Sequence, residues 1–285
     1  MPVEPPIETP RSLADAFAIL AAAPHRPIAG GTDVMVQITG ELGPPPERMI
    51  DLSRLDDLRG ISIDAGTLTL GALTTYTEIR ESALCREHVP ALVEAAATIG
   101  AAQIQNRGTL GGNVANASPA GDTLPVLLAT EAKIVVGGAG GERTIAADQF
   151  WIAYRKTALG PGELVLRIRI PLIAGREVRF RKIGTRRAQA ISKVVMAVAW
   201  RTAEPAGGWS GVRIGLGSVA DRPIRARATE SILEGSRPTE DTAARAAEAL
   251  AAEIHPIDDV RSTADYRRVV AARVLHRFVR DAGGW

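Results

Sequence analysis

The stretch NRGTLGGNVANASPAGD, residues 106–122, decides the fold expected of this chain. Thr109, Gly111, Gly112 and Asn113 predict a small-residue turn after a helix, where backbone N–H groups approach a ligand with no intervening Cβ. Asp122 closes the irregular segment with a carboxylate that suits a pair of ribose hydroxyls. The alternative is a surface loop in which Asp122 caps the helix that follows. Residue types alone leave both interpretations open.

A second glycine segment, IAGGTD, occupies residues 28–33 between a short apolar strand and a short helix. Gly30 and Gly31 allow backbone N–H groups to approach an anion, and the N-terminus of the following helix favours a phosphate. Thr32 adds a hydroxyl. The alternative is a tight strand-to-helix turn capped by Thr32 or Asp33.

A third segment, GLGSVA at residues 215–220, imitates the dinucleotide pattern G-x-G-x-x-A. That pattern requires a helix to begin at the turn. Pro223 would break such a helix in its first turns, so Gly215 and Gly217 are interpreted as strand or bulge glycines.

The composition is that of a globular protein without a nucleic-acid surface. Of the 285 residues, 46% are hydrophobic and 23% charged, which argues against disorder. The net charge is +2 and no basic run occurs, and aromatic residues are too few, at 4%, for base-stacking platforms.

Cys85 is the only cysteine, which excludes an internal disulfide and a cysteine-ligated iron–sulfur cluster or zinc site within this chain. The four histidines show no ligand spacing, so no metal site is expected. No window approaches the length of a membrane span and no signal peptide is recognisable, so we expect a soluble, cytoplasmic chain.

Periodicity and turn signals predict an α+β chain with a boundary near residues 173–176. Before it we expect a capped helix at 13–23, a hairpin at 60–73, one continuous helix at 89–104, a short helix at 122–130, a hairpin at 132–150 and a strand at 162–172. Beyond it we expect strands at 177–184, 192–202 and 210–220, then capped helices at 239–254 and 262–282.

Both glycine segments closely resemble the FAD-binding medium subunit of the molybdenum hydroxylases, the family of xanthine dehydrogenase and carbon monoxide dehydrogenase. IAGGTDVMV and QIQNRGTLGGNVANASPAGDTLPVLLA carry the resemblance, and YRKTALGPGELVLRIRIP and FRKIGTRRAQAISKVVMAVA extend it over nearly the whole chain. It implies a two-lobed FAD-binding domain of the vanillyl-alcohol-oxidase (PCMH) type over residues 1–175, with lobes at about 1–58 and 59–175. Residues 176–285 would form a C-terminal α+β domain with a three-stranded sheet and helices.

The resemblance also implies cofactor-binding positions. The first segment would wrap the FAD pyrophosphate, the second would form another glycine loop with Asn116 facing the cofactor, and Asp122 would bind a sugar hydroxyl. Ile99 and Lys182 would lie at the flavin, and Leu164 and Val165 would line the adenine or flavin wall. The full set is Ile28, Ala29, Gly30, Gly31, Thr32, Asp33, Val34, Ile99, Thr109, Leu110, Gly111, Gly112, Asn113, Asn116, Asp122, Leu164, Val165 and Lys182.

Two positions depart from what relatives often carry. Gln105 stands where an arginine is frequent, and Ala190 stands where many relatives have an aspartate. The missing acid puts in doubt a local charge pair near the flavin, and with it the choice of electron acceptor.

The function that the resemblance implies is electron transfer. A large partner chain with a molybdenum cofactor would oxidise the substrate, and a small chain with two [2Fe–2S] clusters would deliver electrons to this chain's FAD. NAD+, oxygen or another acceptor would then take them, in a complex expected to be a dimer of heterotrimers. The rivals are a self-contained flavin oxidase or reductase of the same fold and a non-enzymatic nucleotide-binding scaffold. No histidine or cysteine is evident beside either glycine segment for a covalent flavin link.

Overall fold

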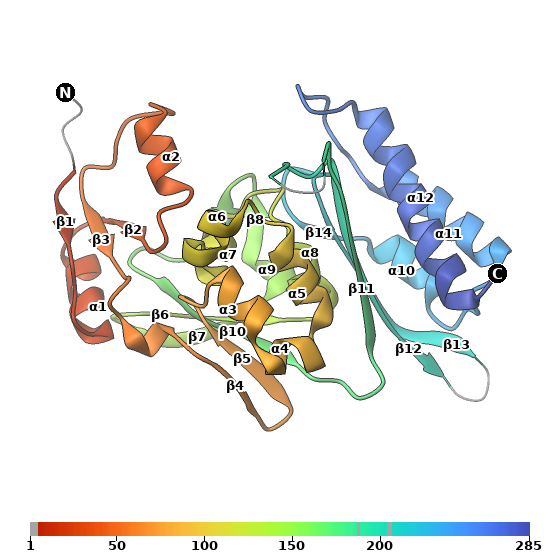
Figure 1. The fold of residues 1–285 in the computed structure, drawn as a ribbon, viewed down its shortest axis with the longest axis horizontal. Coiled ribbons are helices and arrows are strands. Elements are labelled where there is room, and N and C mark those ends of the chain that lie inside the picture. Colours follow the sequence, from red (N-terminus) through yellow and green to blue (C-terminus); the bar gives the residue numbers. More distant parts are fainter. Residues whose placement is uncertain (1–4, 187–188, 204–206) are drawn as a thin grey trace.

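The computed structural model describes residues 5–186, 189–203 and 207–285, and three parts follow one another across the molecule (Figure 1). A small N-terminal lobe lies at one end, a larger lobe built on an antiparallel sheet lies in the middle, and a helix-covered sheet lies at the other end. Among the described residues, no helix is both long and apolar enough to cross a membrane.

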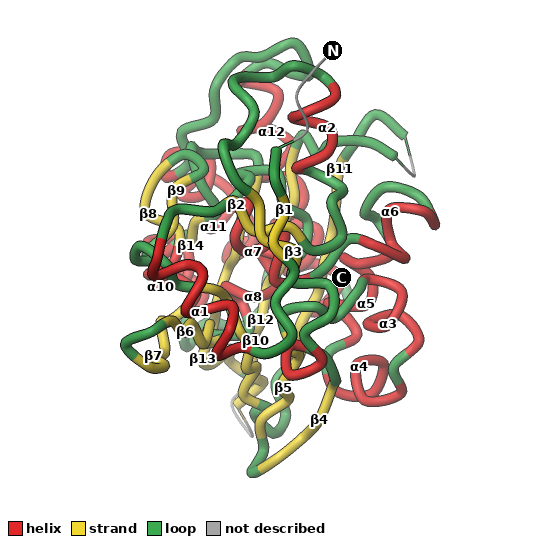
Figure 2. Tube along the Cα trace, turned by 90° about the vertical axis from the view of Figure 1, so that its left-hand side faces the viewer, coloured by secondary structure: helices red, strands yellow, loops and turns green. Residues whose placement is uncertain are grey.

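The first lobe is a three-stranded parallel sheet in the order β1-β3-β2, packed against one helix. Helix α1 begins after Ser12, whose side chain accepts a hydrogen bond from the backbone N–H of Asp15, and it buries Ala16 and Leu20. In Figure 2 the three strands lie side by side in front of the second lobe. The elements are β1 (Ile7–Glu8), α1 (Leu13–Ala22), β2 (Arg26–Ile28), α2 (Val34–Thr39), β3 (Met49–Asp51) and the short 3-10 helix η1 (Asp56–Leu58).

The second lobe is a five-stranded antiparallel sheet in the order β4-β5-β10-β6-β7 with helices packed around it. The hairpin expected at 60–73 and the strand expected at 162–172 are confirmed. The hairpin expected at 132–150 is confirmed as far as Ala146, and residues 147–150 form a short helix instead. The strands are β4 (Ile61–Asp64), β5 (Thr67–Gly71), β6 (Lys133–Gly138), β7 (Gly141–Ala146) and β10 (Leu164–Pro171), with a small separate pair β8 (Trp151–Ala153) and β9 (Lys156–Thr157). The helices are α3 (Tyr76–Glu81), α4 (Ala83–His88), α5 (Pro90–Ala97), α6 (Ala102–Arg107), α7 (Leu110–Asn116), α8 (Leu124–Ala129) and α9 (Ala147–Phe150).

Two local predictions in this lobe are wrong. The continuous helix at 89–104 is broken into α5 and α6 at Gly100, whose φ of 52° lies in the left-handed region that favours glycine. The predicted small-residue turn is the helix α7, which begins after Thr109. An added Cβ on Gly111 would lie 2.6 Å from Cβ of Ala72. This close packing needs glycine and outweighs its poor helix propensity.

The C-terminal part is a sheet in the order β11-β12-β13-β14, in which the first seven residues of β12 are buried on both faces of the sheet. Along β12, Val195, Ala197 and Ala199 face the core of the second lobe, whereas Met196 and Val198 face the core beneath the last helices. The short β14 adds to the three expected strands, and α10 was not expected. The elements are β11 (Glu177–Ile183), β12 (Val194–Ala203), β13 (Gly208–Gly217), β14 (Ile224–Arg225), α10 (Arg227–Leu233), α11 (Glu240–Glu253) and α12 (Ala264–Gly283).

The interpretation of GLGSVA as strand glycines is confirmed, because Gly215 and Gly217 both lie in β13. An added Cβ on Gly215 would lie 2.1 Å from the carbonyl oxygen of Pro125 at the start of α8. The glycine therefore lets α8 pack directly on the sheet.

Candidate functional site

A cavity of about 390 Å³ opens between the two N-terminal lobes, and both glycine segments line it. The β2–α2 turn supplies one wall, the start of α7 the opposite one, and the start of β10 a third. The structure brings together most of the predicted cofactor residues here: Ile28, Ala29, Gly30, Gly31, Thr32, Asp33, Val34, Thr109, Gly111, Gly112, Asn113, Asn116, Leu164 and Val165.

The first glycine segment touches the second lobe through its backbone. An added Cβ on Gly30 would lie only 1.8 Å from the carbonyl oxygen of Arg107, at the end of α6. The guanidinium Nε of Arg107 in turn donates to the carbonyl oxygen of Gly30, 3.3 Å away. Gly31 has a φ of 74°, which favours glycine. Only a glycine pair lets this turn lie flat against the other lobe and keep its backbone open to the cavity.

The second glycine segment presents the first turn of α7 to the cavity. The hydroxyl of Thr109 accepts from the backbone N–H of Gly112 at 3.1 Å, a helix N-cap. The amide oxygen of Asn113 accepts from the hydroxyl of Thr123 at 2.6 Å, which orients the asparagine. Gly112 is exposed at this turn, so a ligand can approach its backbone.

A polar bridge joins the two lobes at the cavity. Asp33 occupies the N-cap position of α2 but makes no capping bond, so the proposed capping role is wrong. Its carboxylate instead accepts from the side-chain amide of Asn116 at 3.0 Å, and the oxygen of that amide accepts from Arg155 at 3.1 Å. Arg155 lines the cavity from the β8–β9 turn. Sequence reasoning missed it because a single arginine in a turn carries no spacing signal.

The remaining predicted residues lie outside the lining of this cavity. The side chain of Leu110 is fully buried in the core. Ile99 lies between α5 and α6, where its carbonyl accepts from the amide of Gln105 at 2.9 Å. Gln105 is itself buried, and its amide oxygen accepts from Arg80 at 2.5 Å. This departure from the family pattern therefore ties α3 to the α5–α6 junction.

Asp122 and Lys182 form a buried ion pair between the second lobe and β11, with 2.6 Å between Oδ2 and Nζ. Nζ also donates to the carbonyl oxygen of Thr98 at 3.0 Å. Oδ1 of Asp122 is buried and has no hydrogen-bond partner. Asp122 does not cap α8, whose N-cap is Thr123. Burial raises the pKa of Asp122 to about 6, and the charge of Lys182 opposes that rise.

The raised pKa of Asp122 predicts a pH-dependent stability in the cofactor-free chain. Because the folded carboxyl holds its proton from about pH 4 to about pH 6 while the unfolded one releases it, its contribution to stability is lost as pH rises through that window. Between pH 4 and pH 7, the melting temperature of the wild type should fall relative to that of Asp122→Asn. Above this range the difference between the two melting temperatures should stay constant. Parallel curves for the two proteins would contradict the raised pKa.

The lining of the cavity fits a dinucleotide. The glycine backbones and Arg155 suit a pyrophosphate, and leucines at the α1 end suit an apolar ring. That apolar end is formed by Leu20, Leu52, Leu58, Leu73 and Leu164. Outside the lining, Oδ1 of Asp122 is a buried acceptor without a hydrogen-bond partner.

The sequence indicated no histidine beside the glycine segments, yet His25 lines the cavity. Its Nδ1 lies 2.8 Å from the carbonyl oxygen of Ala23 and its Nε2 lies 2.9 Å from Glu8. Both ring nitrogens are therefore engaged within the first lobe, which disfavours a covalent link to a cofactor. Within the described ranges, no group of three or more histidine, cysteine or acidic residues could hold a metal ion.

Comparisons with known proteins agree with this arrangement. The family described as "FAD binding domain in molybdopterin dehydrogenase" matches residues 3–173, and the "CO dehydrogenase flavoprotein C-terminal domain" matches residues 179–282. The chain is 32% identical to the carbon monoxide dehydrogenase medium chain of Hydrogenophaga pseudoflava, covering 96% of this chain and 95% of the relative. It is 28% identical to the xanthine dehydrogenase FAD-binding subunit of Escherichia coli O157:H7, with 96% and 95% covered.

Solved structures give the same result. A chain of carbon monoxide dehydrogenase from Hydrogenophaga pseudoflava, in a form lacking the Mo-pyranopterin moiety, superposes with a TM-score of 0.92 at 31% identity, covering 97% of this chain and 96% of that one. A chain of quinoline 2-oxidoreductase from Pseudomonas putida 86 superposes with a TM-score of 0.91 at 28% identity, with 99% and 98% covered. These matches confirm the fold class expected from the sequence.

Proposed function

This chain belongs to the family of FAD-binding medium subunits of the molybdenum hydroxylases, and from that premise we propose that it relays electrons from partner iron–sulfur clusters to NAD+, oxygen or another acceptor. The observation that carries the proposal is the cavity between the lobes, where two glycine segments far apart in sequence face each other. Bound FAD supplies the ability to accept and release electrons one or two at a time.

The protein's own residues bind and orient the cofactor. The backbone of Gly30, Gly31 and Thr32 and the first turn of α7 hold the pyrophosphate, and Arg155 balances its charge. The apolar end beside α1 takes the adenine, with Leu164 and Val165 in its wall. On the opposite side, toward β11, Ile99 and Lys182 mark the flavin end, and Asp122 offers its free oxygen to a sugar hydroxyl.

The partners in this proposal are a large chain with the molybdenum cofactor and a small chain with two [2Fe–2S] clusters, assembled as a cytoplasmic dimer of heterotrimers. The single cysteine, Cys85, is buried in α4, so cysteine-ligated clusters must be held by another chain. The names of the relatives, a medium chain and an FAD-binding subunit, support the same division of labour.

The purified chain should be yellow and should release FAD, not FMN, into the supernatant on acid precipitation. Mixed anaerobically with candidate purines, aldehydes or N-heterocycles, the chain alone should show no bleaching of its flavin absorbance. Adding the iron–sulfur and molybdenum chains should restore bleaching by the substrate. A chemical reductant should bleach the isolated chain, which controls for an inaccessible flavin.

Rapid bleaching of the isolated chain by an organic substrate would overturn the electron-relay proposal and favour a self-contained flavin oxidase. Flavin that stays with the acid precipitate would show a covalent link, contrary to the engaged nitrogens of His25.

A further inference from the structure

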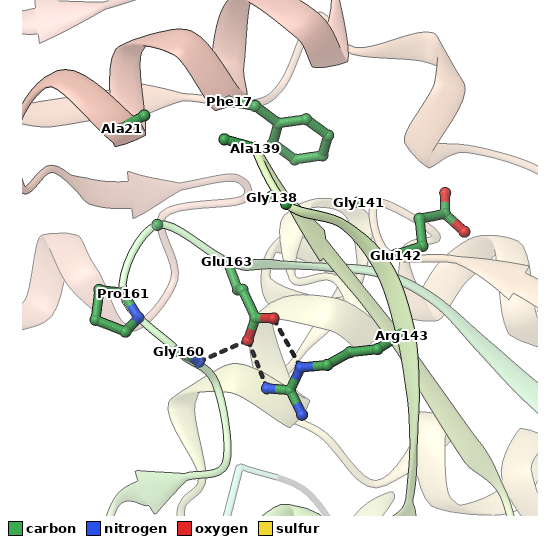
Figure 3. A pocket seen from close by; sticks show the side chains of 12 residues that line it. Phe17, Ala21, Gly138, Ala139, Gly141, Glu142, Arg143, Gly160, Pro161 and Glu163 are labelled. Carbon is green, nitrogen blue, oxygen red and sulfur yellow. Dashed lines mark hydrogen bonds and ion pairs between the residues drawn. The ribbon is translucent and has the colours of Figure 1, made fainter.

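The turn Gly160–Pro161–Gly162–Glu163 is a thin wall with open space on both sides. Gly162 and Glu163 line the inter-lobe cavity, and the whole turn also lines a second hollow of about 320 Å³. Phe17 of α1 and the tip of the β6–β7 hairpin form the far side of that hollow (Figure 3). Packing therefore supports this turn less than it supports an ordinary buried segment.

Arg143 of β7 holds the turn from the second hollow (Figure 3). Its Nε and Nη2 donate to the two carboxylate oxygens of Glu163 at 2.8 and 2.6 Å, a bidentate ion pair. Nη2 also donates to the carbonyl oxygen of Ala158 at 2.8 Å, and Glu163 accepts from the backbone N–H of Gly160 at 2.6 Å. One guanidinium thus joins both ends of the turn, with the fork geometry that favours strong charge-assisted bonds.

The turn needs such a clamp because its own residues are permissive. Gly160 and Gly162 have no side chains to pack, and Gly162 has a φ of 73°. Glycines lose more conformational freedom on ordering than other residues. Apart from the clamp, the turn is closed by a backbone hydrogen bond from the N–H of Glu163 to the carbonyl oxygen of Gly160 at 3.2 Å.

The wall stands at one end of the inter-lobe cavity. An added Cβ on Gly162 would lie 3.4 Å from the carbonyl oxygen of Leu20, so the turn abuts α1. Helix α1 and strand β11, which carries Lys182, lie on opposite sides of α7 (Figure 1). The turn is therefore at the apolar end, remote from the Asp122–Lys182 pair.

We infer that Arg143, which does not itself line the inter-lobe cavity, is a positioning residue that holds the Gly160–Glu163 turn as the adenine-end wall. This inference rests on the proposed function. It assigns to Arg143 a part in the selection of FAD over FMN, because only ligands that contain the adenylate reach this wall.

The experiment measures dissociation constants of the apo-protein for FAD by fluorescence, and for ADP and FMN by displacement of FAD. Arg143→Gln should weaken the binding of FAD and of ADP by about three- to fivefold each, the order expected for a half-exposed ion pair, and leave the binding of FMN unchanged. Arg143→Lys keeps the charge without the fork and should fall between. The matched control is Arg167→Gln, which removes another bidentate arginine–glutamate pair on the same sheet, with Glu142, in which the arginine is 38% exposed against 49% for Arg143.

Unchanged FAD and ADP affinity in both Arg143 variants would overturn the inference. Equal losses for all three ligands would also overturn it, because general destabilisation does not distinguish adenylate from flavin. Should Arg143→Gln not fold, Arg143→Lys still decides between these outcomes. If wild type bound neither flavin, the proposed function itself would fail, which is a result distinct from a defect confined to the variants.

Discussion

A chain carrying Gly30→Ala is expected to emerge from purification without FAD. The added methyl would lie 1.8 Å from the backbone carbonyl oxygen of Arg107, so either the first glycine segment or α6 must move. Backbone cannot step aside as a flexible side chain can, and the upper range of overpacking costs, ~3 kcal/mol, corresponds to about a hundredfold weaker binding. The ratio of visible to ultraviolet absorbance after gel filtration, and FAD titration of the apo-protein, measure the loss.

The matched control for this change is Gly140→Ala at the tip of the β6–β7 hairpin. An added Cβ on Gly140 has no neighbouring atom within 4 Å, so this variant should keep its FAD. Thermal unfolding of both apo-proteins separates lost binding from lost folding. A fully yellow Gly30→Ala protein would show that the cofactor does not depend on the contact between the two lobes.

The second large effect is expected from Lys182→Met, which leaves the buried carboxyl of Asp122 without its counter-ion. Removing one partner of a buried ion pair costs up to about 3–5 kcal/mol, but the pKa of Asp122, already about 6, rises further without Lys182, so the carboxyl takes up a proton and the cost is smaller. The side chains of Lys182 and Asp122 are only 10% and 8% exposed, so solvent offers little relief. The apo-protein's melting temperature should fall by about 5 °C at neutral pH.

A double-mutant cycle isolates this interaction. Adding Asp122→Asn to Lys182→Met replaces the unpaired carboxyl by a neutral amide, which removes the cost of protonating it, and should restore part of the lost stability. Lys156→Met, at an exposed position of β9, is the control for simple loss of a lysine and should leave the melting temperature unchanged. If Lys182→Met unfolded at the wild-type temperature, the ion pair would not stabilise the contact between the second lobe and the C-terminal sheet.

The sequence predicted the glycine walls of the site because glycine is required wherever backbone approaches backbone, as it does at Gly30. It did not predict the helix α7, since a segment with two glycines and two asparagines has poor helix propensity. The close contact of Gly111 with Ala72 determines its structure. The break at Gly100 was hidden in the same way, inside a run of alanines that reads as one helix.

The polar contacts of the site lay beyond sequence reasoning for a different reason. Asp122 and Lys182 are 60 positions apart, and Asn116 and Arg155 are 39 apart. Neither pair has a spacing that periodicity can reveal. Their meeting depends on where β11 and the β8–β9 turn pack, which only the tertiary structure determines.

The burial of β12 on both faces has a consequence for how modular this protein is. Its buried residues Val195, Ala197 and Ala199 complete the core of the FAD-binding lobe, and Met196, Val198 and Trp200 complete the core beneath α11 and α12. Each part therefore covers apolar surface of the other. Cutting the chain near residue 175 would expose the apolar side of α8, all of whose residues are buried. The two parts are therefore not independent folding units that could be exchanged between proteins. We expect them to unfold together in one cooperative transition and not one after the other.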